Sequence, residues 1–382
     1  MDKKILTQKI KQEAALVGFP LVGVTSPDPP DRLDFFHDWI KSGYFASMDW
    51  IAAERSLARR ADPRKILPEC QSILVLASPY PAPMGNVKGG KIASYALNKD
   101  YHDVLIERLQ LLVESLEVWV GTTVPNRWYT DTGPILEKEL AMRAGLGWIG
   151  KNTTLINKKI GSYFFLAEIL LGIELVTDEP ITESFCGSCT LCLDTCPTGA
   201  LRAPYTLDAN RCISYLTIEH GEEIPLELRP QMGDWIFGCD ICQVVCPWNK
   251  PSAEAAIIIE DLQPREELAN LDLDQELCLS QSEFSARFRG SPIKRAKRRG
   301  YLRNVAVVLG NLKNPAALPA LAAALEDPEP LVRAHAAWAL GEIGGEEALT
   351  LLNNRAKTEV DLQVLLEIQG AVKTLSKRAI DS

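Results

Sequence analysis

The hydrophobic and polar positions along the first half of the chain predict two kinds of element. The unbroken apolar run from Ser72 to Ala77 is typical of a short buried strand. The segment from Tyr101 to Glu117 instead repeats apolar residues every three or four positions, which predicts an amphipathic helix. This alternation of strand-like and helix-like segments over residues 1–177 predicts an α/β domain.

Two further parts differ in composition. Residues 178–260 are rich in cysteine and proline and contain few long periodic segments, so a small domain here would need bound metal in place of a hydrophobic core. Residues 261–382 are rich in Ala and Leu and have a helical pattern. We therefore predict an α+β multidomain protein with domains at 1–177, 178–260 and 261–382.

The last part contains a repeat at a spacing of 31 residues. Leu309-Gly310 matches Leu340-Gly341, and further leucine and isoleucine positions match at the same spacing. The segment Glu326-Asp-Pro-Glu-Pro between the copies supplies turn residues. Paired helices joined in this way are typical of HEAT repeats, which serve either as binding scaffolds or as structural support.

Composition and charge narrow the class of protein. The chain has 382 residues, of which 46% are hydrophobic and 24% are charged, as in ordinary globular proteins. Its N-terminus lacks the apolar core of a signal peptide, and the longest apolar stretch, Ser162 to Val176, is interrupted by Glu168 and Glu174. We expect a soluble, cytoplasmic protein.

A formal charge of −9 argues at first against a nucleic-acid partner, but it hides a local excess of basic residues. Between Phe284 and Leu325 there is no Asp or Glu. The basic residues of this stretch are Arg287, Arg289, Lys294, Arg295, Lys297, Arg298, Arg299, Arg303 and Lys313. They form either a phosphate-binding surface or an ordinary solvated helix face.

Eight of the ten cysteines fall between Cys186 and Cys246, where metal ligation is a better explanation than disulfides. The run Cys186-x2-Cys189-x2-Cys192-x3-Cys196-Pro197 has the spacing of bacterial ferredoxins, in which the fourth cysteine binds a second iron–sulfur cluster. A second set, Cys239-x2-Cys242-x3-Cys246-Pro247, repeats the end of this run, and Cys212 precedes it.

Pseudo-symmetry between the two sets assigns the ligands of two 4Fe–4S clusters. The first cluster takes Cys186, Cys189, Cys192 and Cys246, and the second takes Cys196, Cys212, Cys239 and Cys242. Structural zinc is the alternative, but it usually binds two separated cysteine pairs. Cys70 and Cys278 lie outside the set and are expected to behave as small hydrophobic residues.

The segment from Gly145 to Asn152 matches G-x-G-x-x-G and nearly matches a phosphate-binding loop. Both interpretations require a strand directly before the glycines, whereas Ile135 to Ala144 has a helical pattern. Asn152 also stands where a phosphate-binding loop needs Ser or Thr. We therefore expect no nucleotide site here, and we expect the glycines to let the backbone approach some other large ligand.

Several of these stretches together resemble the epoxyqueuosine reductase family. They are Asp131-Thr-Gly-Pro134, Ala144 to Asn152, Cys186 to Pro197, Pro204 to Thr217 and Gly238 to Asn249. The resemblance covers almost the whole chain. The ferredoxin run alone occurs in many proteins, but its combination with Arg211-Cys-Ile-Ser-Tyr215 and the terminal repeats is far more specific.

The resemblance implies an activity and a further cofactor. It implies that residues 1–177 bind base-off cobalamin, which receives electrons through the two clusters, and that the enzyme removes the epoxide oxygen of epoxyqueuosine at the wobble position of tRNA. This is the last step of queuosine biosynthesis. The sequence has no Asp-x-His-x-x-Gly motif, so no histidine ligand to cobalt is expected. Asp131 matches the family's proton donor, whereas by itself it would be interpreted as a turn or cap residue.

The resemblance also implies contacts and partners. Its implied cobalamin contacts, each of which could instead be a packing or turn residue, are Tyr95, Asp131, Lys151, Asn152, Ser162, Ser214 and Tyr215. The implied substrate is an anticodon stem-loop, and from the basic stretch we expect its backbone to be held by Lys294, Arg295, Lys297, Arg298 and Arg303. We expect a monomer that receives electrons from a soluble one-electron donor such as a flavodoxin or ferredoxin.

Two other functions remain possible from the sequence. One is another ferredoxin-fused cobalamin-dependent reductase that acts on a small molecule, such as a dehalogenase, for which an exported precursor with a twin-arginine leader would be expected. The other is an electron carrier or iron–sulfur scaffold without catalytic activity. A simple carrier would not need a large α/β domain or a basic helical module.

Overall fold

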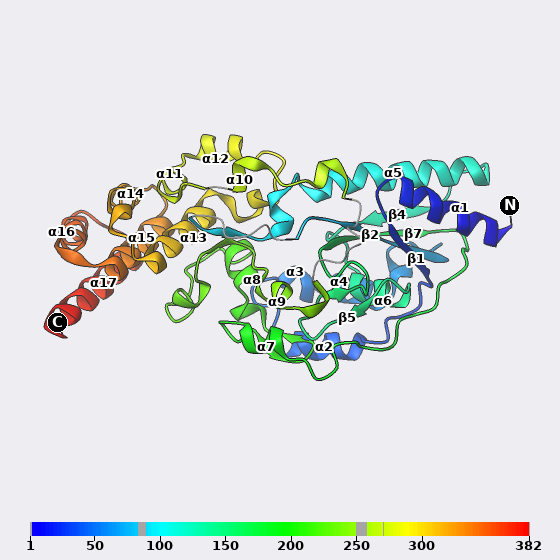
Figure 1. The fold of residues 1–382 in the computed structure, drawn as a ribbon, viewed down its shortest axis with the longest axis horizontal. Coiled ribbons are helices and arrows are strands. Elements are labelled where there is room, and N and C mark those ends of the chain that lie inside the picture. The colour runs from blue at the N-terminus through cyan, green and yellow to red at the C-terminus, as the bar shows by residue number, and fades with distance from the viewer. Residues whose placement is uncertain (1, 83–88, 250–257, 270, 382) are drawn as a thin grey trace. The chain divides into compact units, whose positions relative to one another are not determined.

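The computed structural model describes residues 2–82, 89–249, 258–269 and 271–381 (Figure 1). These residues form two compact units that do not follow the order of the chain. The first unit comprises residues 1–83, 98–210 and 240–264, and the second comprises 84–97, 211–239 and 265–382. The three domains predicted from composition do follow the order of the chain, and that division remains a prediction.

A four-stranded sheet lies at the centre of the first unit, with the order β1-β2-β7-β4. Its strands are β1 (Leu21–Thr25), β2 (Ser72–Pro79), β7 (Phe164–Leu171) and β4 (Asn126–Tyr129). All of β2 is buried, as the apolar run predicted. Every neighbouring pair of strands is antiparallel, a detail that the alternation of helices and strands does not reveal.

Helices and short strands complete the first unit. The helix α5 (Tyr101–Val120) confirms the predicted amphipathic segment; the Asp100 side chain caps its start, and Gly121, in the left-handed conformation, caps its end. The other helices are α1 (Lys3–Leu16), α2 (Leu33–Lys41), α3 (Asp49–Ala52), α4 (Glu54–Ala61), α6 (Glu137–Arg143), α7 (Leu191–Thr195) and α9 (Ile241–Val244). The short strands are β5 (Trp148–Ile149), β6 (Leu155–Ile156), β8 (Leu201–Ala203) and β9 (Thr206–Leu207).

Most of the second unit is helical. Its helices are α8 (Ile213–Ile218), α10 (Glu266–Ala269), α11 (Leu273–Leu277), α12 (Gln281–Arg287), α13 (Lys297–Leu312), α14 (Leu318–Ala324), α15 (Pro330–Ile343), α16 (Gly345–Ala356) and α17 (Leu362–Asp381). The two strands β3 (Lys91–Ile92) and β10 (Trp235–Phe237) pair in parallel.

The predicted 31-residue repeat corresponds to the stacking of α13, α15 and α17 (Figure 1). A Cβ atom on Gly310 would lie 2.6 Å from the Trp338 ring, and one on Gly341 would lie 2.7 Å from the Ala371 side chain. Each Leu-Gly pair of the repeat therefore marks the place where one helix closely approaches the next.

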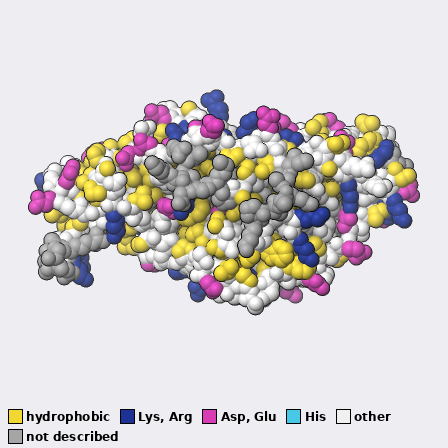
Figure 2. Space-filling model, in the orientation of Figure 1, with side chains coloured by type: hydrophobic (Ala, Val, Ile, Leu, Met, Phe, Trp, Pro, Cys, Tyr) yellow, Lys and Arg dark blue, Asp and Glu magenta, His cyan; other side chains and the backbone are white. Residues whose placement is uncertain are grey.

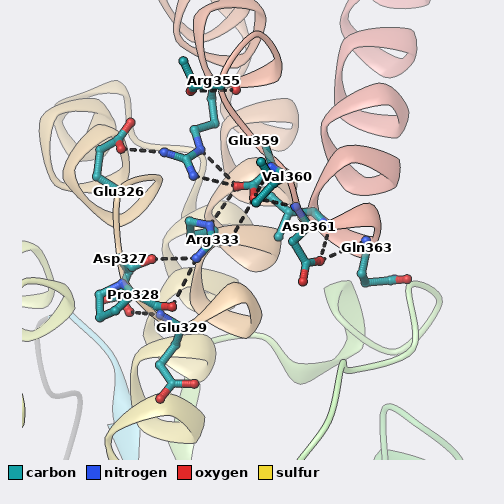
Figure 3. Close-up of polar contacts among 12 residues, drawn as sticks. Glu326, Asp327, Pro328, Glu329, Arg333, Arg355, Glu359, Val360, Asp361 and Gln363 are labelled. Atoms are coloured by element: carbon teal, nitrogen blue, oxygen red, sulfur yellow. Dashed lines mark hydrogen bonds and ion pairs between the residues drawn. The ribbon is translucent and has the colours of Figure 1, made fainter.

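A buried network of ion pairs holds the turns of this stack (Figure 3). The Arg333 guanidinium donates to both carboxylate oxygens of Glu359, over 2.8 and 2.9 Å, and to the carbonyl oxygens of Asp327 and Pro328. Arg355 also donates to Glu359 and reaches Glu326 at the surface. Although burial opposes its ionisation, the hydrogen bonds from Arg333, the backbone and Arg355 lower the pKa of Glu359 to about 2.

The surface carries charges of both signs. On the face seen in Figure 2, acidic and basic side chains are interspersed. None of the helices that the structure describes is both long enough and apolar enough to cross a bilayer.

Candidate functional site

The first unit brings together the four cysteines predicted to hold the first cluster. Cys186 and Cys189 close a tight turn in which the Cys189 N–H donates to the Cys186 carbonyl, and Cys192 follows in the short helix α7. Cys246 lies two residues after the end of α9. These four side chains line one cavity of about 230 Å³. All ten cysteines belong to the described residues, and none forms a disulfide.

The cavity suits a ligated iron–sulfur cluster better than four thiols. Burial and the neighbouring Cys186 sulfur raise the pKa of both Cys192 and Cys246, so crowded thiolates repel one another unless a cation is bound between them. One side of the cavity is aromatic: the Trp148 ring lies 5.0 Å from the rings of both Phe185 and Trp248. Half-buried sulfur ligands in an apolar, aromatic cavity fit a 4Fe–4S cluster.

The four cysteines of the second set are divided between the units. Cys196 and Cys242 belong to the first unit, and Cys212 and Cys239 belong to the second. Cys212 directly precedes α8, and Cys239 follows Gly238, whose φ of 67° bends the chain and whose N–H donates to the Thr217 hydroxyl. The assignment of these four residues to one cluster remains a prediction.

Three of the predicted cobalamin contacts form hydrogen bonds with the cysteine segments. The Lys151 ammonium donates to the carbonyl oxygens of Gly187 and Cys189, over 2.7 and 2.9 Å. The Asn152 amide donates to the Cys242 carbonyl, and the Ser162 hydroxyl donates to the Gln243 side chain. These side chains hold the segments that carry the predicted cluster ligands. Their contact with cobalamin remains a prediction.

Sequence reasoning missed Asn249, which completes this arrangement. Its side-chain oxygen, Oδ1, accepts from the Ser162 N–H over 2.6 Å. Its side-chain nitrogen, Nδ2, donates to the Ser162 hydroxyl and to the Gln243 carbonyl. The available signal was its position directly after Cys246-Pro-Trp, within the stretch that carries the family resemblance.

The glycine-rich segment needs a correction. A helix, α6, precedes it, as expected. However, a Cβ atom on Gly145 would lie 2.8 Å from the Glu179 carbonyl oxygen, and one on Gly147 would lie 2.3 Å from that of Ile156. The glycines therefore allow the chain to pack against its own backbone. The expectation that they make room for a ligand is wrong for these two positions.

Asp131 lies in an exposed turn between β4 and α6 with a φ of 56°, in the left-handed region. Its Oδ2 accepts a hydrogen bond of 2.7 Å from the Tyr101 hydroxyl. Its N–H donates to Glu137 Oε1 over 2.8 Å. The Tyr101 ring stacks on Phe165 with a centroid distance of 4.2 Å and an angle of 11°. An exposed carboxyl that a phenol orients, on a backbone anchored to a second carboxyl, is well placed to exchange a proton with a ligand.

The other three predicted cobalamin contacts belong to the second unit. The Tyr95 ring lies 6.3 Å from the Phe237 ring. Ser214 and Tyr215 lie in α8, where Tyr215 is buried and its ring lies 5.7 Å from His220. The structure therefore brings Asp131, Lys151, Asn152 and Ser162 into one unit, and Tyr95, Ser214 and Tyr215 into the other.

Two of the five residues predicted to contact tRNA are buried in the structure. Arg303 is fully buried and donates to the carbonyl oxygens of Leu216, His220 and Glu222. Arg298 is also buried, in an ion pair with Asp327. These two side chains stabilise the second unit because their guanidinium groups satisfy buried acceptors, and they are not available to a phosphate backbone.

The remaining three predicted contacts form a surface site. Lys294, Arg295 and Lys297 are exposed and line an open depression of about 410 Å³ together with Ile218 and Glu219. Arg295 donates to both carboxylate oxygens of Glu219, over 2.8 Å each. We call these three residues the basic site.

Three family models match parts of the chain. The model described as epoxyqueuosine reductase QueG, DUF1730, matches residues 60–132; a 4Fe-4S double cluster binding domain matches 185–249; and HEAT repeats match 296–373. An epoxyqueuosine reductase of Pseudomonas aeruginosa is 41% identical over 356 residues, which cover 90% of this chain and 96% of that protein. The chain belongs to the epoxyqueuosine reductase family.

Other epoxyqueuosine reductases support the same family assignment. The Escherichia coli enzyme is 40% identical over 349 residues, covering 90% of each chain. A crystal structure of an epoxyqueuosine reductase with an epoxyqueuosine-modified tRNA-Tyr stem loop superposes with a TM-score of 0.90 at 33% identity, covering 97% of this chain and 99% of that one. The double-cluster model confirms the prediction of two 4Fe–4S clusters over zinc, and the HEAT model confirms the terminal repeats.

Proposed function

We propose that this chain reduces epoxyqueuosine at the wobble position of tRNA to queuosine. The observation that carries the proposal is its identity of about 40% to epoxyqueuosine reductases over nine tenths of both chains. The cysteine cavity and the exposed Asp131 carboxyl support it, because deoxygenation of an epoxide requires both electrons and protons.

The reaction consumes two electrons and two protons and releases water. When bound, cobalamin reduced through the two clusters would supply the two electrons with which both carbon–oxygen bonds of the epoxide are broken. The predicted contacts carry hydroxyl, amide, ammonium and carboxyl groups, which suit the amide side chains of a corrin; Tyr95 and Ser214, which are partly exposed, are examples. Asp131 would donate a proton to the departing oxygen, and the Tyr101 hydroxyl would orient the Asp131 carboxyl.

The partners and the compartment are part of the proposal. The basic site would hold the phosphate backbone of the anticodon stem-loop, because exposed ammonium and guanidinium groups bind phosphates without sequence preference. We expect a cytoplasmic monomer that accepts single electrons from a flavodoxin or ferredoxin. We also propose that residues 1–177, 178–260 and 261–382 act as the catalytic, electron-transfer and tRNA-binding parts.

The test is turnover of epoxyqueuosine-containing tRNA by the anaerobically purified protein, followed by mass spectrometry of the nucleosides. The Asp131→Asn variant should turn over roughly 10²–10⁴-fold more slowly with unchanged iron content, because an amide cannot donate the carboxylic proton. Asp103→Asn, which changes an exposed acid on α5, is the control and should keep the wild-type rate. A wild-type rate in Asp131→Asn would contradict the proton-donor role, and a wild-type protein without turnover would contradict the function.

A further inference from the structure

A fully buried carboxyl group lies in the central sheet of the first unit. Glu168 is on β7 between Val75 of β2 and Tyr129 of β4, and none of its surface is exposed. Its strand neighbours on the same face, Leu166 and Leu170, pack in the hydrophobic core beneath α6. Neither carboxylate oxygen of Glu168 has a hydrogen-bond partner among the residues that the structure describes. A leucine would pack at least as well here, so the acid needs a functional explanation.

Glu168 belongs to a cluster of three carboxyl groups. Glu137 begins α6, and its Oε1 accepts the Asp131 N–H, so Glu137 lies directly behind the Asp131 turn. Burial, followed by the charges of Glu137 and Asp131, raises the pKa of Glu168 well above its usual range. Burial and the Asp131 charge likewise raise the pKa of Glu137 to about 8. Burial in this cluster therefore favours the protonated forms of Glu137 and Glu168.

The positively charged groups near the cluster do not reverse the rise in the pKa of Glu137. Lys138 and Arg60 face Glu137 and favour its charged form, but less than burial and Asp131 oppose it. The Lys138 ammonium donates to the Thr153 carbonyl, and the Arg60 guanidinium lies 5.9 Å from the Phe36 ring.

The stoichiometry of the proposed reaction requires more than Asp131 can supply. Reduction of an epoxide to an alkene and water consumes two protons, and a single carboxyl group holds one. A bound substrate would cover the exposed Asp131 turn and exclude bulk water during the reaction. The second proton must then come from a group that is already inside the protein.

We propose that Glu137 and Glu168 form a proton reserve that supplies the two protons of each turnover through Asp131. This inference rests on the proposed function. Glu137 passes its proton to Asp131, which gives it to the oxygen as the first carbon–oxygen bond breaks. Glu168 then replaces the proton on Glu137, and Glu137 passes it to Asp131. Asp131 protonates the departing hydroxide, which leaves as water. Two electrons and two protons are consumed, and solvent reprotonates the cluster after product release.

The test variant is Glu168→Gln, which keeps the shape but cannot carry the transferable proton. The matched control is Glu139→Gln on the same helix, α6, whose acid is also buried and has a raised pKa but accepts a hydrogen bond from the Asp31 N–H instead. We expect kcat of Glu168→Gln to fall at least about 10-fold with KM for tRNA unchanged, and Glu139→Gln to keep the wild-type kcat.

Two readouts separate a proton reserve from a structural role. Because Glu168→Gln must take its second proton from solution, its kcat should increase with imidazolium concentration, whereas wild-type kcat should not. Infrared spectra of the wild type at pH 7 should contain a carboxylic-acid C=O band that Glu168→Gln lacks and Glu139→Gln retains. This second readout does not depend on turnover.

Several outcomes would overturn the proposal. One is a wild-type kcat in Glu168→Gln; another is a reduced kcat that imidazolium does not restore. If Glu168→Gln fails to fold, two other measurements test the proposal. A wild-type kcat in Glu168→Asp would exclude the proton reserve, and so would the absence of a protonated glutamate band from the infrared spectrum of the wild type at pH 7. If the wild type does not turn over the tRNA at all, the proposed function fails instead, and the infrared result still reports on the cluster.

Discussion

The buried network at Arg333 predicts a large loss of stability when Glu359 is changed to Gln. In the wild type, Glu359 accepts hydrogen bonds from Arg333, from Arg355 and from the N–H groups of Val360 and Asp361 (Figure 3). Its side chain is completely buried. An amide at this position would direct N–H groups at a guanidinium, would remove the carboxylate that pairs with Arg333, and would leave Arg355 with Glu326 alone.

The magnitude follows from the pKa. A change from an ordinary 4.5 to about 2 on folding corresponds to about 3 kcal/mol of stabilisation by the charged form at neutral pH. Because the folded pKa is lowered, this contribution is complete above pH 4.5 and is lost as the pH falls toward 2. The difference between wild type and Glu359→Gln should therefore shrink by about 1 kcal/mol between pH 7 and pH 4.

The assay is urea unfolding of the full-length protein, followed by circular dichroism at several pH values. Glu326→Gln is the control, because Glu326 also binds Arg355 but its side chain is 70% exposed, and its loss should cost less than ~1 kcal/mol. If Glu359→Gln is as stable as Glu326→Gln at pH 7, or if its deficit does not change with pH, the reasoning about this network is wrong.

Three further predictions concern the cysteines, the helix packing and the basic site. Cys189→Ala and Cys242→Ala should each remove roughly one cluster, measured as iron and sulfide per chain after anaerobic reconstitution, and two bound zinc ions without sulfide would contradict the assignment. Gly341→Ala should destabilise the repeats by about 1–3 kcal/mol because its methyl group would meet Ala371 at 2.7 Å, whereas Gly370→Ala, with no atom within 4 Å, should be neutral or stabilising in urea unfolding. Replacing the three residues of the basic site by Ala should weaken tRNA binding and lower the slope of log affinity against log salt concentration by somewhat less than one for each lost contact. The cluster content should not change. If affinity and slope equal those of the wild type, the basic site is an ordinary solvated face and does not bind tRNA.

The sequence predicted those parts of the structure that depend on local pattern. Cysteine spacing predicted the four residues of the first cavity, because ligands of one cluster must be close together in the chain or in its symmetric copy. The 31-residue spacing of Leu309-Gly310 and Leu340-Gly341 predicted the helix stack, because close helix packing needs a small residue at each crossing. The helix before the glycine-rich segment followed from its apolar period.

The parts that the sequence did not reveal depend on long-range contacts. Arg303 looked like a surface base because its neighbours are basic, yet the tertiary fold surrounds it with three carbonyl acceptors. Glu168 looked only like an interruption of an apolar stretch, because nothing in its neighbourhood along the chain shows that Glu137 and Asp131 approach it. Sequence position alone does not reveal whether a charge faces water or the core.

The chain leaves and re-enters each compact unit, and this constrains the order in which the protein can fold during synthesis. The first unit includes residues 240–264, so its core cannot be completed until that segment has left the ribosome, although 98–210 emerge long before. Residues 84–97 are synthesised early, but the second unit to which they belong cannot form until residues 211–239 and 265–382 have been synthesised. A nascent chain stalled near residue 210 would lack Gln243 and Asn249, the partners that hold Ser162, and should therefore be a poor substrate for iron–sulfur assembly and a good one for proteases.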